Sequence, residues 1–221
     1  MNQRLLFAID GLSTWVGKAV SWLLVVLMCV VCVEVIKRYL LNTPTAWIFD
    51  AENMLYGSLF MLAGAYTLAQ NAHVRGDFLY SSMRPRVQAG LDLFLYLVFF
   101  IAGIAALIYS GWIFAVESWR INEHSTVTAE GPPVWQFKFV IPIAGLLVMI
   151  QGLAEILRCI ACLRTGEWPS RLKDVAETDV IEEQLAHSEF VDEESRKIAI
   201  ERARKIEEAA RQRGMGGDLQ T

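Results

Sequence analysis

The sequence predicts an all-α integral membrane protein: four transmembrane helices, an N-terminal interfacial helix and a soluble helical C-terminal tail. Four long apolar runs, each with at most one charged residue, are separated by short polar segments. Residues 1–164 carry eleven Lys or Arg and ten Asp or Glu, whereas residues 165–221 carry nine and fourteen. The apolar runs lack the polar face that a soluble helix turns to water, which disfavours a soluble bundle.

The first element, residues 1–18, places Leu5, Ile9, Leu12 and Val16 at positions i, i+4, i+7 and i+11. Charged residues are interspersed between these apolar positions. This pattern is typical of an amphipathic helix that lies in the membrane interface.

The membrane domain is predicted to cover residues 19–164, because a run of roughly 20 apolar residues is needed to cross about 30 Å of hydrocarbon. Its spans are expected at about 19–36, 53–72, 93–116 and 139–157. The charged residues within them are Glu34 and Glu155, each near a span end and able to reach the interface or to pair with Lys37, Arg38 or Arg158. An uncharged midplane favours a scaffold, with the substrate pathway elsewhere.

Small residues recur at helical spacing in the third predicted span. Ala102, Ala106 and Ser110 lie four residues apart, and small side chains in register let membrane helices approach closely. They fit either packing within this chain or docking of a partner membrane subunit. Pro142 falls in the first turn of the fourth predicted span, where proline is tolerated.

Positive charge near the spans predicts the orientation. With the N-terminus inside, nine Lys or Arg lie in inner segments and four in outer loops. Because inner loops are enriched in Lys and Arg, both termini are predicted to be cytoplasmic.

Residues 165–221 form the acidic tail. Glu193/Lys197, Glu201/Lys205 and Glu207/Arg211 are i, i+4 pairs in the favourable order, which predicts a partly helical segment. It is interpreted either as a solvated helix or as a contact with another cytoplasmic surface.

The cysteines form two C-x-x-C pairs, Cys29/Cys32 and Cys159/Cys162. One pair lies deep in the first span and the other at the inner end of the fourth, so a shared zinc site is disfavoured and the cysteines are expected to be small apolar fillers. We expect no metal site.

The histidines, His73, His124 and His187, lie outside the predicted spans, which disfavours a haem or quinone subunit. No nucleophile–base pair is recognisable, so the chain is not expected to be an enzyme or to bind a cofactor. Its acidic balance gives no support to nucleic-acid binding.

Several short motifs occur in a recognisable order: Trp47 and Glu52, then His73-Val74-Arg75 with Asp77, then Pro133-Val134-Trp135 with Lys138 and Pro142, and Gln151-Gly152-Leu153. With them, residues 10–165 resemble the small, DctQ-like membrane subunit of tripartite ATP-independent periplasmic (TRAP) transporters. The details are most similar to the subgroup labelled mannitol/chloroaromatic. Gly76, where the family usually has valine, and the acidic tail depart from that pattern.

The resemblance implies the small subunit of a sodium-coupled, binding-protein-dependent secondary transporter for an organic acid or a related small solute, located in a bacterial inner membrane. Its partners would be the large permease subunit, a periplasmic solute-binding protein and membrane lipids, with sodium bound by the large subunit. Trp47, Glu52 and Trp135 would anchor the outer face, and His73, Arg75 and Asp77 would order the inner loop. The alternatives are an autonomous channel or carrier, and a membrane-anchor redox subunit.

Overall fold

The computed structural model describes residues 3–72, 80, 83–128, 131–172 and 174, and the described elements are helical. They are, in chain order, α1 (Gln3–Tyr39), α2 (Ile48–Ala69), α4 (Pro85–Leu95), the π-helical turn η1 (Tyr96–Phe100), α5 (Ile101–Arg120) and α6 (Trp135–Thr165). The predicted tail and the motif residues His73, Arg75 and Asp77 lie outside the described residues, apart from the first few positions of the tail.

Three described helices are long and apolar enough to cross a membrane: α1, the continuous stretch Pro85–Arg120 and α6. The 22-residue α2 is not among them, because its first turns carry Asp50, Glu52 and Asn53 beside the apolar residues. The all-helical prediction is therefore confirmed for the described part of the chain, with three candidate spans.

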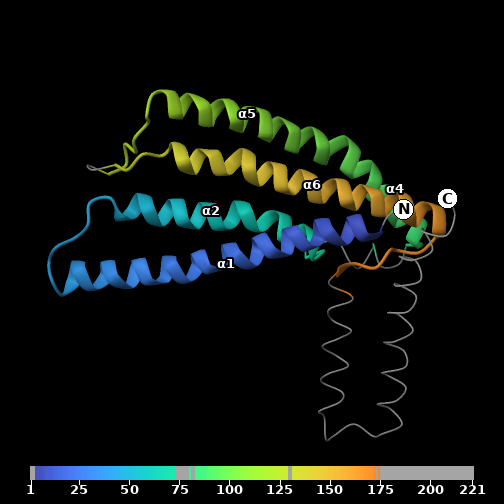
Figure 1. The fold of residues 1–221 in the computed structure, drawn as a ribbon, viewed down its shortest axis with the longest axis horizontal. Helices are drawn as coiled ribbons and strands as arrows, with labels where there is room; N and C mark the ends of the chain where they lie inside the picture. The colour runs from blue at the N-terminus through green and yellow to red at the C-terminus, as the bar shows by residue number, and fades with distance from the viewer. Residues whose placement is uncertain (1–2, 73–79, 81–82, 129–130, 173, 175–221) are drawn as a thin grey trace, which may run out of the picture.

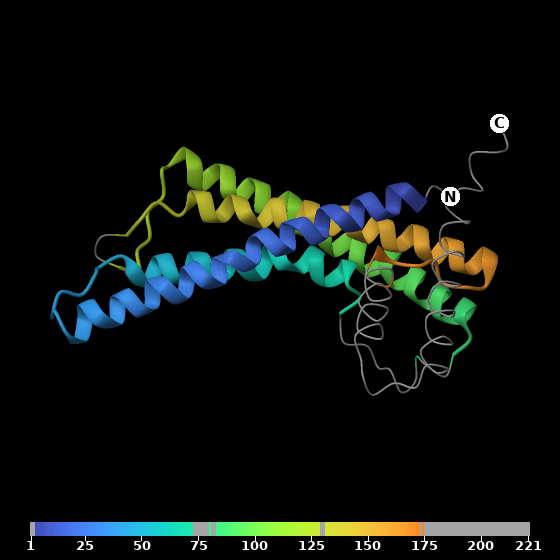
Figure 2. The same ribbon diagram turned by 60° about the horizontal axis from the view of Figure 1, so that its bottom comes forward.

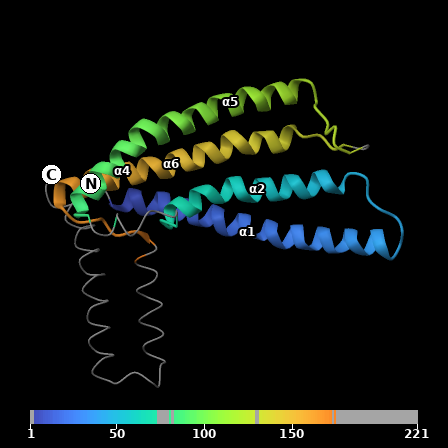
Figure 3. The ribbon, with the colours of Figure 1, turned by 180° about the vertical axis from the view of Figure 1, so that it is seen from behind.

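The helices form two antiparallel pairs that lie side by side (Figure 1, Figure 3). One pair is α1 with α2 and the other is α5 with α6, while α2 and α6 contact each other along the middle. Both pairs turn at the same end of the bundle, which we call the loop end. At the opposite end α4 begins, α6 ends and the first turns of α1 cross α6 (Figure 2). We call this the cluster end.

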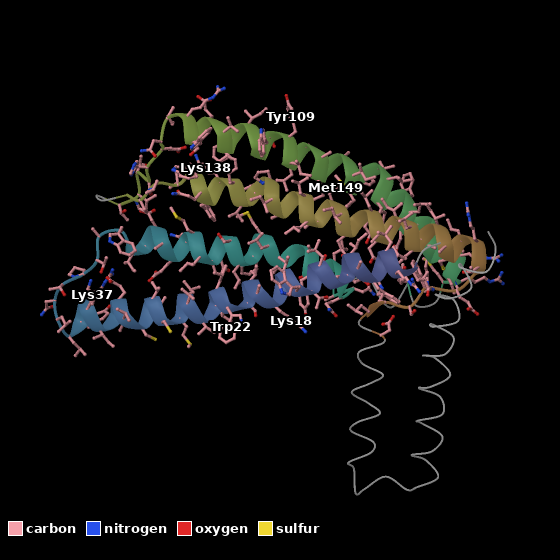
Figure 4. The ribbon with its side chains drawn as sticks, in the orientation of Figure 1. Lys18, Trp22, Lys37, Tyr109, Lys138 and Met149 are labelled. Carbon is pink, nitrogen blue, oxygen red and sulfur yellow. The ribbon has the colours of Figure 1, made fainter. Side chains whose placement is uncertain are left out.

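Helix α1 is longer than a membrane is thick. Its 37 residues extend about 55 Å, against about 30 Å of hydrocarbon. Lys18 and Trp22 point away from the bundle, and Lys37 lies near the far end of the helix (Figure 4). The helical rise between the two lysines is about 28 Å, close to the hydrocarbon thickness.

Residues 3–18 belong to the same helix as the first predicted span and continue into it without a break. The interfacial location of residues 3–18 stays a prediction.

Glycines allow α6 to approach its neighbours closely. A Cβ atom built on Gly152 would lie 2.1 Å from the Phe100 ring, at the end of η1. A Cβ on Gly111 of α5 would lie 2.9 Å from Ile141. These contacts leave no room for a methyl group unless the neighbouring side chain moves, so α6 packs closely against its neighbours at these two points.

Two expectations about α6 and the cysteines need correction. The helix begins at Trp135, so Pro142 is its eighth residue and lies in the helix interior, not in the first turn. Cys159 and Cys162 are buried and pack in the core with Ala89, as expected of apolar fillers. Cys29 and Cys32 are exposed on α1 and fill no internal space.

Candidate functional site: a buried charge cluster where α1 crosses α6

Four ionisable side chains are buried together at the cluster end. Asp10 comes from the second turn of α1, Glu155 and Arg158 from α6, and Arg171 from the segment that follows α6. Ser13 and Gln151 complete the group, which we call the charge cluster. It joins segments that are up to 162 residues apart in the chain.

Arg158 is the centre of the charge cluster, and its side chain is 0 % exposed. Its Nη2 donates to Asp10 Oδ2 at 2.5 Å and its Nη1 donates to Glu155 Oε1 at 2.5 Å. Each carboxylate is 2 % exposed. A buried charge is costly unless it is paired and hydrogen-bonded, and these contacts supply both conditions.

Polar residues on the same helix faces extend the contact. Gln151 Nε2 donates to Asp10 Oδ1 at 2.9 Å, and Ser13 Oγ donates to Gln151 Oε1 at 2.8 Å. Ser13 follows Asp10 by three residues and Gln151 precedes Glu155 by four, so each pair shares one helix face. The interface between α1 and α6 is therefore polar at this end.

The chain after α6 folds back to close the charge cluster. Gly166 adopts φ 85°, a left-handed conformation that ends α6 and reverses the chain. The indole of Trp168 then donates to Gln88 Oε1 at 3.0 Å, which fixes the returning segment against α4. Arg171 Nη2 donates to Glu155 Oε2 at 2.8 Å, and the amide of Leu172 donates to Asp10 Oδ2 at 3.4 Å.

The charge cluster is neutral and closed. Two carboxylates face two guanidinium groups, and Arg171 is only 11 % exposed. The Nε atom of Arg158 is buried and has no partner among the described residues. Within the same described part of the chain, no three His, Cys, Asp or Glu side chains are grouped to hold a metal ion. The arrangement is suited to fixing α1, α6 and the returning segment relative to one another.

The loop end pairs its charges separately. Glu34 accepts from Arg38 at 3.0 Å and from the amide of Thr45 at 3.2 Å, which orders the chain between α1 and α2. Asp50, at the start of α2, is buried and accepts from Ser125 Oγ at 2.6 Å. It also accepts from the hydroxyl of Thr128 in the same loop.

Lys138 links α6 to the loop that precedes it. Its ammonium group donates to the Glu123 carboxylate and lies 3.9 Å from the centroid of the Phe114 ring. This hydrogen bond holds the pKa of Glu123 below its usual range. Glu123 also accepts, through its backbone carbonyl, from the amide of Val134 at 2.9 Å, so the loop is tied to the start of α6 at two points.

The residues singled out in the sequence fall into three groups. Trp47, Glu52, Trp135 and Lys138 lie at the loop end, on the first turns of α2 and α6. Ala102, Ala106 and Ser110 are all exposed on α5, so they do not pack inside this chain. Pro142 is buried, next to Gly111. Their functional roles stay predictions.

The charge cluster itself was only partly anticipated. Glu34 and Glu155 were expected either to reach the interface or to pair with Lys37, Arg38 or Arg158, and the structure shows Glu155–Arg158 in the charge cluster and Glu34–Arg38 at the loop end. Asp10, Ser13 and Arg171 were not recognised as buried polar residues. The available signal was the i, i+3, i+7 spacing of Asp10, Ser13 and Gly17, which are all buried and share one face of α1.

Comparison with known proteins identifies a family for this chain. The family model described as "Tripartite ATP-independent periplasmic transporters, DctQ component" matches residues 27–162, more than half of the chain. The matched region contains Glu155 and Arg158 but neither Asp10 nor Arg171. No curated protein matches the chain.

Proposed function

Because the chain belongs to the DctQ component family of tripartite ATP-independent periplasmic transporters, we propose that it is a static scaffold subunit that packs against the large permease subunit. The family is a transporter component and not an enzyme family, and it implies the small membrane subunit of such a transporter. In this proposal the large subunit binds sodium and moves the solute, and a periplasmic binding protein delivers it. The solute is an organic acid or a related small molecule, in line with the mannitol/chloroaromatic resemblance.

The observation that carries this proposal is the neutral, closed charge cluster. Ionisable groups that serve a transport path usually face a water-filled cavity and keep a free coordination position. Here Asp10 and Glu155 accept hydrogen bonds from Arg158, Arg171 and Gln151 and are almost completely buried. The buried charges therefore support a fixed assembly of helices and not a substrate site.

The exposed face of α5 supports the docking part of the proposal. Ala102, Ala106 and Ser110 lie on this face, and a Cβ atom on the neighbouring Gly103 would meet nothing within 4 Å. The Ser110 hydroxyl is satisfied locally by the Ala106 carbonyl at 2.7 Å. A face with small, locally satisfied side chains can receive a second membrane helix at close range.

The proposal includes α2 as a fourth span and places both termini in the cytoplasm. The residues of α2 after Glu52 are uncharged, and its 22 residues extend about 33 Å. Accessibility of single cysteines introduced in the α1–α2 loop and after α6, to a membrane-impermeant reagent in intact cells, tests this arrangement.

The function is tested by co-purification and uptake. The chain is tagged, expressed with the large permease of the same transporter and solubilised in mild detergent; the complex is then reconstituted with the binding protein. We expect stable co-purification and sodium-dependent solute uptake that is lost without this chain. Equal transport by the large permease alone would overturn the scaffold proposal.

The docking face is tested by increasing the size of one small residue. Ala106→Trp is expected to reduce co-purification of the large permease, because the bulky ring keeps the partner helix at a distance. The matched control is Val31→Trp, at an exposed position on α1. If both variants co-purify like the wild type, the docking face lies elsewhere.

A further inference from the structure

The cationic residues at the two ends of the bundle differ in their pairing. At the loop end, Arg38 pairs with Glu34 at 3.0 Å, Arg120 with Glu117 at 3.8 Å and Lys138 with Glu123. At the cluster end, Arg84, Arg86 and Arg164 are exposed, and none of them forms an ion pair with another described residue. The loop end therefore pairs three of its cations with carboxylates, while Lys37 donates to the Thr45 hydroxyl. The three arginines at the cluster end have no carboxylate partner among the described residues.

These three arginines lie where two helices meet. Arg84 and Arg86 flank Pro85 at the start of α4, and Arg164 is in the last turn of α6. The Cys162 thiol lies 3.6 Å from the Pro85 carbonyl, and Arg86 Nε is 3.3 Å from the position of a Cβ on Gly166. Residues 84–88 and 163–168 together contain three arginines and one acidic residue, Glu167, which leaves an excess of two positive charges.

An apolar face continues directly from the arginines. Val87, Leu91 and Phe94 are 53 %, 44 % and 59 % exposed and occupy positions i, i+4 and i+7 of α4. These positions share one face of the helix. A cationic rim followed along one helix by an exposed apolar stripe matches the two parts of a phospholipid, an anionic headgroup and an acyl chain.

We propose that Arg84, Arg86 and Arg164, with Val87, Leu91 and Phe94, form a binding site for an anionic phospholipid. The phosphate accepts hydrogen bonds from the guanidinium groups. A planar guanidinium group can donate two parallel hydrogen bonds to one phosphate. The acyl chain lies along the apolar stripe of α4. Each cation near an anionic membrane surface contributes about fivefold in affinity, so three together contribute on the order of a hundredfold.

The test compares the full chain with the variant in which Arg84, Arg86 and Arg164 are all changed to glutamine. Both proteins are placed in nanodiscs of phosphatidylcholine with increasing phosphatidylglycerol, and bound lipid is measured by native mass spectrometry. We expect the wild type to retain phosphatidylglycerol over phosphatidylcholine, and the triple variant to lose that preference by roughly a hundredfold. The triple lysine variant keeps the charge and is expected to keep most of the preference.

The matched control is Arg120→Gln, which removes an exposed arginine at the loop end and is expected to leave the preference unchanged. Circular dichroism and gel filtration verify that each variant is folded. An unchanged preference in the triple glutamine variant overturns the proposal, as does an equal loss in Arg120→Gln.

Discussion

The two ends of this bundle stabilise charged residues in different ways. At the cluster end, one buried group contains Asp10, Glu155, Arg158 and Arg171. Each of these side chains forms an ion pair with at least one side chain of opposite charge. At the loop end, charges are held in separate pairs, and in Arg120–Glu117 both side chains are exposed. Removing one member of a buried group leaves an uncompensated charge in a medium of low dielectric constant, whereas an exposed partner is simply solvated by water. Equivalent substitutions should therefore have unequal effects at the two ends.

The largest effect is expected for Arg158→Met, which leaves Asp10 and Glu155 buried with only Arg171 as a cation. The free energy of unfolding should fall by about 3–5 kcal/mol, measured by SDS titration of the protein in mild detergent. Changing Asp10 to asparagine in the same chain should restore part of the loss, because one uncompensated charge is then removed. A loss below about 1 kcal/mol would show that water reaches the charge cluster.

The next effect is expected for Arg171→Gln. Glu155 keeps Arg158 but loses two charged hydrogen bonds, so the loss should be about 1.5–3 kcal/mol. Arg120→Gln at the loop end is the matched control and should cost less than about 1 kcal/mol. Equal losses for the two variants would contradict the contrast between the ends.

A third prediction separates packing from charge. Gly152→Ala should destabilise by about 1–3 kcal/mol, because its methyl group overlaps the Phe100 ring. Gly103→Ala, on the open face of α5, should be neutral or stabilising by up to about 1 kcal/mol. Phe100→Leu should relieve the first variant, and a double-mutant cycle measures that coupling.

The smallest effect concerns pH at the loop end. The pKa of Glu123 is lowered in the folded protein by the hydrogen bond from Lys138. Its contribution to stability is therefore present above its unfolded pKa and is lost as the pH falls through the folded value. The thermal midpoint of the wild type should fall between about pH 5 and pH 3 more steeply than that of Glu123→Gln. Parallel curves would show that the pair does not stabilise the fold.

The helical fold follows from hydropathy, because apolar runs of this length satisfy their backbone groups only as helices in a membrane. The pairs Glu34–Arg38 and Glu155–Arg158 were predictable for a local reason, since each lies three or four residues apart on one helix. The contact of Asp10 with Arg158 spans 148 residues, and helical periodicity contains no information on which helices cross. The same limit applies to Arg171, whose position depends on the reversal at Gly166.

The start of α6 shows a different limit. Hydropathy predicts where an apolar run begins, but Trp135 to Lys138 continue the helix beyond it. Their backbone is held by the contact of Val134 with Glu123 and by the Lys138 ion pair, which involve a loop that the apolar pattern does not describe. Pro142 was therefore placed too near the helix start.

The distance along the chain between Asp10 and Arg158 also sets an order of events during synthesis. The 148 residues between them require on the order of ten seconds of translation at about 5–20 residues per second. Asp10 is thus made long before either arginine that neutralises it, and Arg171 follows Arg158 by 13 further residues. The first helix is therefore made with an unpaired carboxylate near its N-terminal end, and its contact with α6 can form only after the last helix has been synthesised.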